Sequence, residues 1–84
     1  MSTILVKYRG HLATLTGITE ETTSAEDVKG LLKSIRKRYS PEAEKAARSM
    51  LIALNGESIL LLKRFKTVLK NGDKVCFFPL CAGG

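Results

Sequence analysis

Residues 71–84 carry the strongest structural signals in this chain, and they read NGDKVCFFPLCAGG. The first three are turn formers, because Asn, Gly and Asp readily adopt the backbone angles of tight turns. The residues after them alternate as in a β-strand, which places Val75 and Phe77 together on one face. Pro79 has no amide hydrogen, so sheet pairing on that side should stop there. We therefore predict a last strand over residues 74–80 with Val75 and Phe77 in the core.

Upstream of this strand, the apolar pattern predicts further strands and a helix. Alternating residues, apolar runs and turn signals predict strands over residues 3–9, 18–23, 50–54 and 57–62. Residues 11–17 fit a loop or one helical turn. Between the second and third strands, Ser24 is the predicted helix N-cap, and Asp27 completes a pattern like a capping box. An apolar stripe at helical spacing follows, formed by Val28, Leu31, Leu32, Ile35 and Tyr39. Pro41 ends this helix and opens a short second one over residues 42–49.

This order of elements predicts an α+β layer fold. A mixed sheet of four to five strands is covered on one face by one main helix. A chain of 84 residues forms one domain. We expect that domain to span residues 1–80 and a flexible tail to span residues 81–84.

Size and composition exclude several classes of protein. A domain this small has room for one modest core but not for a deep substrate cavity as well, so we expect no independent catalysis. The apolar runs fall short of the roughly 20 residues that a membrane span needs, and the first residues lack the order of a signal peptide. A cytoplasmic protein with no membrane partner is the expectation.

The charge is strongly positive, at +6, with 14 Lys and Arg against 8 Asp and Glu. The cations concentrate in residues 29–48 and 63–74, where they could meet phosphate groups or an acidic protein. A solvated helix face and a sheet edge guarded by lysines explain the same pattern. We favour this explanation, and a nucleic-acid partner is not expected.

The residues that commonly hold metals or act as nucleophiles are few. Cys76 and Cys81 together with His11 are too few for a structural zinc site, which normally has four ligands, so we expect no metal. A bridge between the two cysteines would close only a short loop, which favours two reduced thiols. His11 and Tyr39 have no evident nucleophile beside them, and the chain has no phosphate-binding loop.

The last two residues, Gly83-Gly84, offer a different chemistry. They directly follow the apolar strand and would present the terminal carboxylate on a thin stalk. Glycine has no Cβ, so a narrow channel could hold the backbone and still reach the carbonyl. A free carboxylate is a poor electrophile, but transfer to ATP as an acyl-adenylate would supply a leaving group.

Two segments of the chain resemble the ubiquitin-like sulfur carriers. They are the turn into the last strand, residues 71–75, and the ending, residues 77–84. The closest resemblance is to the small subunit of molybdopterin synthase, and the thiamine and tRNA-thiolation sulfur carriers are related to it. The likeness extends over nearly the whole chain in length and element order, and it implies the β-grasp fold.

The resemblance implies that the chain is a cosubstrate, or the small subunit of a sulfurtransferase like molybdopterin synthase. An E1-like enzyme would adenylate Gly84 with ATP and magnesium, and a persulfide donor would convert it to a thiocarboxylate. A larger synthase subunit would then use that sulfur for molybdopterin. The chain itself would bind no cofactor.

The resemblance also implies roles for residues near the end. Gly84 carries the reacting carbonyl, Gly83 gives clearance in the channel, and Ala82 and Cys81 thread its entrance. With Val75 and Phe77 facing inward, Phe78 and Leu80 are the residues expected to dock on a partner protein. Leu60 and Leu62 could extend this docking patch, because so small a domain cannot easily bury every side chain of residues 59–62, although core packing is the favoured explanation for these leucines.

Several readings remain open at this point. The sulfur could go to thiamine or tRNA thiolation instead, or Gly84 could be joined to a target lysine as in a protein modifier. A basic β-grasp module that binds RNA or an acidic protein is a third possibility. Cys81 and the positive charge depart from the usual family pattern, in which a small apolar residue and an acidic carrier are common.

Overall fold

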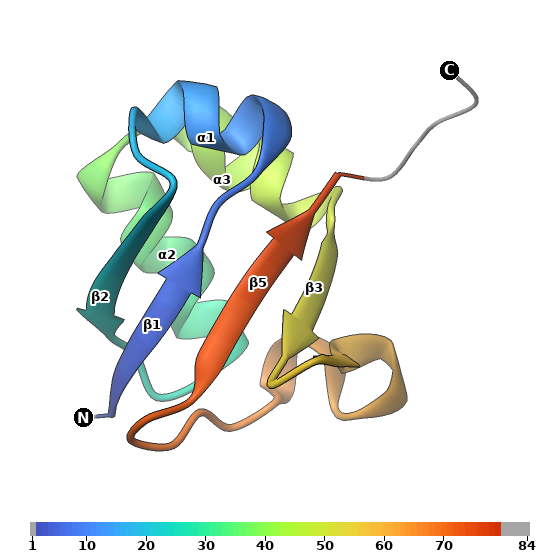
Figure 1. The fold of residues 1–84 in the computed structure, drawn as a ribbon. Helices are drawn as coiled ribbons and strands as arrows, with labels where there is room; N and C mark the ends of the chain where they lie inside the picture. Colours follow the sequence, from blue (N-terminus) through green and yellow to red (C-terminus); the bar gives the residue numbers. More distant parts are fainter. Residues whose placement is uncertain (1, 80–84) are drawn as a thin grey trace.

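A five-stranded mixed sheet lies at the centre of the structure, a computed structural model that describes residues 2–79 (Figure 1). Its strands are β1 (Thr3–Lys7), β2 (Glu20–Ser24), β3 (Leu51–Leu54), β4 (Glu57–Ser58) and β5 (Lys74–Phe78). Their order across the sheet is β2-β1-β5-β3-β4. The first and last strands, β1 and β5, run parallel in the middle, and the other neighbours pair antiparallel.

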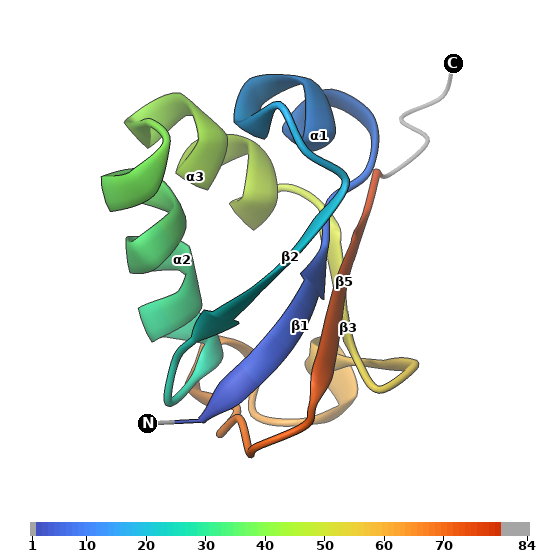
Figure 2. The same cartoon turned by 60° about the vertical axis from the view of Figure 1, so that its left-hand side comes forward.

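Helices cover one face of this sheet, as Figure 2 shows. They are α1 (Gly10–Thr16), α2 (Val28–Arg38) and α3 (Pro41–Arg48), and two short 3-10 turns, η1 (Ile59–Leu61) and η2 (Arg64–Lys66), precede β5. The mixed sheet under a main helix is the predicted β-grasp arrangement. Within residues 2–79, every helix is too short or too polar to cross a membrane.

The core lies between the sheet and α2. The predicted stripe of α2 is buried at Val28, Leu31, Leu32 and Ile35. It meets the inner face of the two central strands, where Val75 and Phe77 are fully buried as predicted. The ring of Phe77 stacks on that of Tyr8 with centroids 6.0 Å apart. Because β5 alternates strictly, its other side chains point away from the helices.

The start of α2 corrects one prediction. Ser24 is not the N-cap, because its backbone pairs with Thr3 and belongs to β2. The cap is Asp27, whose carboxylate accepts a hydrogen bond of 2.6 Å from the Gly30 amide. The sheet extends the second strand to Ser24, so the helix begins three residues later than the capping pattern indicates. The next helix, α3, starts as predicted, with Pro41 in its first turn.

The segment after the Asn55-Gly56 turn also differs from its prediction. A strand over residues 57–62 is wrong beyond Ser58, since residues 59–61 form a 3-10 turn. The Ser58 hydroxyl accepts from the Leu60 amide at 3.2 Å and so diverts the backbone from sheet pairing. This turn buries Ile59, and the leucines that follow it are exposed.

Candidate functional site

The site predicted from the sequence is the end of β5 and the tail that leaves it. The last described residue, Pro79, follows directly on Phe78, the final residue of β5. The predicted reacting residue Gly84 lies outside the described residues. So do three predicted threading residues and one docking residue: Gly83, Ala82, Cys81 and Leu80. The structure therefore describes the surface from which the tail departs.

An apolar surface covers the face of the sheet that points away from the helices. Strand pairing places Leu51 beside Phe78 and Ala53 beside Cys76. We call this surface the outer patch, and its members are Leu5, Leu51, Ala53, Cys76 and Phe78. Four of them are half-buried, and Ala53 is buried. Phe78 thus lies at the end of an apolar surface on the strand that leads into the tail, as a docking residue would.

The other two predicted docking residues follow β4. Leu60 is 62% exposed and Leu62 is 38% exposed. Leu60 lines a groove of about 130 Å³ together with Leu51 and Phe65, so this groove adjoins the outer patch at Leu51. Leu62 lies around a different hollow, with Leu61 and other residues. Leu60 thus lines a groove together with Leu51, the strand partner of Phe78, whereas Leu62 lies around another hollow.

Sequence reasoning missed several exposed apolar residues in the same connection. Leu61, Phe65 and Val68 are exposed, and Leu61 is the most exposed of them at 76%. A hydrophobic run in a connecting segment tells little about which residues face outward, because two 3-10 turns rather than a strand set their directions.

The start of α1 lies beside Phe78 and Pro79, the two residues from which the tail departs, which we call the tail root. The sequence did not indicate this contact. The guanidinium of Arg9 lies 5.4 Å from the centre of the Phe78 ring. Gly10 has a φ of +59° and lies against Pro79, so close that a Cβ on Gly10 would stand 3.2 Å from the Pro79 Cγ. The sequence indicated only that Gly10 ends the first strand.

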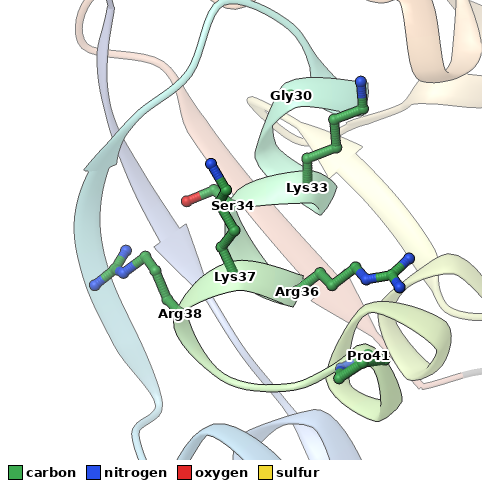
Figure 3. Close-up of a pocket in the computed structure, with 7 residues that line it drawn as sticks. All are labelled: Gly30, Lys33, Ser34, Arg36, Lys37, Arg38 and Pro41. Carbon is green, nitrogen blue, oxygen red and sulfur yellow. The ribbon is translucent and has the colours of Figure 1, made fainter.

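A basic hollow of about 630 Å³ lies on the outside of α2 and is shown in Figure 3. Its charged side chains are Lys33, Arg36, Lys37 and Arg38, and their charged ends point in different directions (Figure 3). Two of the charges have partners, since Arg38 pairs with Glu21 and Arg36 lies 3.7 Å from Glu44. The cations therefore do not converge on one anion, and this hollow lacks the geometry of a compact phosphate site.

A buried polar cluster on the other side of α2 is structural. The Glu21 carboxylate on β2 accepts hydrogen bonds from the hydroxyls of Tyr8 and Tyr39 and from the Arg38 guanidinium. Burial, helped by the hydrogen bond to Glu21 and its charge, holds the pKa of Tyr8 well above its ordinary value. Through these hydrogen bonds the cluster links β1 and β2 to the C-terminal end of α2.

The turn into β5 is held by a carboxylate. Asp73 accepts from the Asn55 side-chain amide at 3.0 Å and from the Lys70 backbone amide at 2.8 Å. These hydrogen bonds hold the pKa of Asp73 below its usual range. In the part of the chain that the structure describes, no cluster of three His, Cys, Asp or Glu could hold a metal ion.

Comparison with known proteins extends this description. The model of the ThiS family matches residues 6–84. No curated protein sequence matches the chain.

Three solved structures illustrate the likeness. The small archaeal modifier protein 1 of Methanosarcina acetivorans is 26% identical, with a TM-score of 0.87 over 100% of this chain and 98% of that one. A Pyrococcus furiosus protein assigned as subunit 1 of a molybdopterin converting factor is 27% identical, with a TM-score of 0.76 over 94% and 98%. A chain in the complex of subunits 1 and 2 of the Helicobacter pylori molybdopterin-converting factor shares the fold at 22% identity. Its TM-score is 0.69 over 98% and 99%.

The family match takes in the end of β1, the other four strands, the turn into β5 and the final Gly-Gly. Together with the β-grasp arrangement and the apolar surface at the tail root, it leads to one conclusion. This chain belongs to the ThiS family, among the ubiquitin-like sulfur carriers and modifiers.

Proposed function

We propose that this chain is a sulfur carrier that brings sulfur to molybdopterin as a thiocarboxylate on Gly84. The observation that carries the proposal is the family match, because it extends over the last residue and so includes Gly83-Gly84. The apolar surface at the tail root supports it, since a carrier must dock on the enzymes that use its tail. The chain is then a cosubstrate or a synthase subunit, and it binds no cofactor of its own.

The chemistry begins with an E1-like enzyme that uses ATP and magnesium. A carboxylate oxygen of Gly84 attacks the α-phosphorus of ATP, and pyrophosphate leaves. The terminal sulfur of a donor persulfide then attacks the Gly84 carbonyl carbon and displaces AMP, which gives an acyl disulfide. A donor thiol cleaves the sulfur–sulfur bond, so the carrier keeps one sulfur as a thiocarboxylate and the donor becomes a disulfide. Because this route consumes ATP, we place the protein in the cytoplasm.

The partner that accepts the sulfur docks on the outer patch. Leu51 pairs with Phe78 across the sheet and lines a groove with Leu60, so we propose that one apolar partner surface covers both Phe78 and Leu60. We place Leu80 at the margin of the same contact. Leu62 lies around another hollow and would contribute only to a wider interface. In Helicobacter pylori, subunits 1 and 2 of the molybdopterin-converting factor form a protein–protein complex, and we propose a larger partner subunit for this chain.

The decisive experiment is to identify the chemical group at the C-terminus of the protein isolated from its own cells. A thiocarboxylate-selective reagent followed by sequencing of the tagged peptide should place the tag on Gly84. Intact mass alone would mislead, because replacing oxygen by sulfur nearly matches one added oxygen on Cys76 or Cys81. A variant with Gly84→Val serves as the control, since it should lose the tag and keep the wild-type thermal transition. An untagged carboxylate under every growth condition would contradict the proposal.

The acceptor is tested separately, in cells that lack this gene. Loss of the molybdopterin dithiolene, with thiamine and thiolated tRNA unchanged, is the expected result. Loss of thiamine or of thiolated tRNA instead would reassign the carrier to that pathway without changing its chemistry.

A second function, protein modification, is favoured by the similarity to the small archaeal modifier protein 1. In this case the ε-amine of a target lysine attacks the activated Gly84 carbonyl, and the leaving group departs as an isopeptide forms. Mass spectrometry of trypsin-digested cell protein would detect a lysine that carries the C-terminal residues of this chain. Such conjugates without any thiocarboxylate would make the modifier the main function.

A further inference from the structure

The tail root, where the chain leaves β5 at Phe78 and Pro79, lies against the start of α1. Figure 2 shows the connection from β1 to α1 passing beside the end of β5. A Cβ on Gly10 would come within 3.2 Å of the Pro79 Cγ and 3.3 Å of its Cβ. Contacts so short would force the neighbour to move. Gly10 therefore leaves the space in which the proline ring lies.

The residue before Gly10 makes the second contact. The Arg9 guanidinium lies over the Phe78 ring, 5.4 Å from its centre, at a distance typical of a cation–π interaction. Two consecutive residues of the α1 start thus touch the two consecutive residues of the tail root.

This start of α1 is itself firmly held. Tyr8, just before Arg9, is 1% exposed, and its amide donates to the Thr19 carbonyl at 2.8 Å. Leu12, two residues after Gly10, is fully buried. Arg9 and Gly10 are therefore fixed between two buried side chains, and they can restrict the position of Phe78 and Pro79.

We propose that Arg9 and Gly10 are positioning residues that set the direction in which the tail leaves the sheet. The inference rests on the proposed function, in which Gly84 must reach the α-phosphorus of ATP in a partner enzyme. Five residues follow Pro79 and could span about 17 Å when extended. A change of about 10° at the root would then displace the far end by about 3 Å, and even 1 Å can cost on the order of 100-fold in rate.

The test compares two glycines that both have a positive φ. Gly10 has a φ of +59° and Gly17 a φ of +79°, but a Cβ on Gly17 would meet nothing within 4 Å. Asn tolerates positive φ better than most residues, so Gly10→Asn and Gly17→Asn carry similar strain. Only Gly10→Asn pushes on Pro79.

The first readout is the amide NMR spectrum of the full chain, which needs no partner. We expect Gly10→Asn to shift the Phe78 amide and the amides beyond Pro79, and Gly17→Asn to leave them unchanged. In a Pro79→Gly background the effect of Gly10→Asn should shrink to that of Gly17→Asn, because both the ring and the Cβ that it meets are gone. Equal shifts from the two glycine variants would overturn the proposal.

The second readout is exchange of labelled pyrophosphate into ATP, catalysed by the E1-like enzyme of the same genome. We expect Gly10→Asn to lower kcat about tenfold and to change KM less than about twofold, because the docking surface is intact. Arg9→Gln should act in the same direction, and Gly17→Asn should behave as wild type. Leu60→Asp, a docking variant, should raise KM instead.

The outcomes separate this inference from the proposed function. If the wild-type chain supports exchange and Gly10→Asn behaves as Gly17→Asn does, the positioning role is wrong and the carrier function stands. If the wild-type chain supports no exchange, the proposed function is overturned, and the positioning role is overturned with it.

Discussion

Replacing Glu21 by Ala should destabilise the domain more than its place on an edge strand indicates. The Glu21 side chain is only 12% exposed and is the shared acceptor of Tyr8, Tyr39 and Arg38. In Glu21→Ala, the Tyr8 hydroxyl stays buried without a partner, which costs about 1–3 kcal/mol. The loss of the hydrogen bond from Tyr39, which water can partly replace, adds about 1 kcal/mol or less.

The ion pair with Arg38 adds little to this cost. The Arg38 side chain is 43% exposed, and exposed pairs contribute about 0–1 kcal/mol. The expected decrease in the free energy of unfolding is therefore about 1–5 kcal/mol. For a domain of this size each kcal/mol lowers Tm by about 4–8 °C.

Urea unfolding of four variants measures this effect. Glu20→Ala is the matched control, because it removes the same charge from an exposed neighbour on the same strand. Tyr8→Phe and the double variant with Glu21→Ala complete a double-mutant cycle. The coupling free energy between Tyr8 and Glu21 should be about 1–2 kcal/mol. If Glu21→Ala falls within about 0.5 kcal/mol of Glu20→Ala, the buried cluster does not stabilise the fold as argued.

Three further predictions concern β5 and the surface beside it. Val75→Asp buries an unpaired charge at a fully buried position and should abolish cooperative thermal unfolding, whereas Lys74→Asp on the exposed neighbour should keep it. The hydrogen bonds that lower the pKa of Asp73 stabilise the fold above its unfolded pKa of about 3.9, and this contribution disappears as the pH falls through the lower folded value. Urea unfolding at several acidic pH values should therefore show a steeper loss for the wild-type chain than for Asp73→Asn, and parallel curves would argue against the Asp73 contacts. Leu60→Asp should leave Tm nearly unchanged and weaken binding to the larger synthase subunit about tenfold or more, measured by calorimetry. Leu61→Asp should have little effect on that affinity, because Leu61 lies around a different hollow, so equal losses for both variants would place the docking surface elsewhere.

Much of the fold could be predicted because its strongest signals are local. The alternation in β5 identifies Val75 and Phe77 as core residues, and the apolar stripe identifies the buried face of α2. Ser40 and Pro41 are consecutive residues, and together they mark the start of α3. Such signals need only a residue and its near neighbours, so they can be read before any tertiary contact is known.

The candidate site could be predicted only in part. Phe78 follows from the alternation of β5, and so small a core indicated that some of residues 59–62 could be exposed without telling which ones. That Leu60 lines a groove together with Leu51, the strand partner of Phe78, could not be predicted. It depends on the pairing of Leu51 with Phe78 across the sheet and on the 3-10 turn after β4, which only the folded chain produces.

The sequence by itself determined the order of the strands around α2 and α3, the two faces of the last strand and the ThiS-family ending, because each depends on consecutive residues. Tertiary structure decided the rest. Pairing with β1 made Ser24 a strand residue and transferred the helix cap to Asp27. The tertiary structure also brings Gly10 into contact with Pro79, although the two residues lie near opposite ends of the sequence. Contacts between residues so far apart depend on the sheet that joins the first and last strands, and no local pattern carries that information.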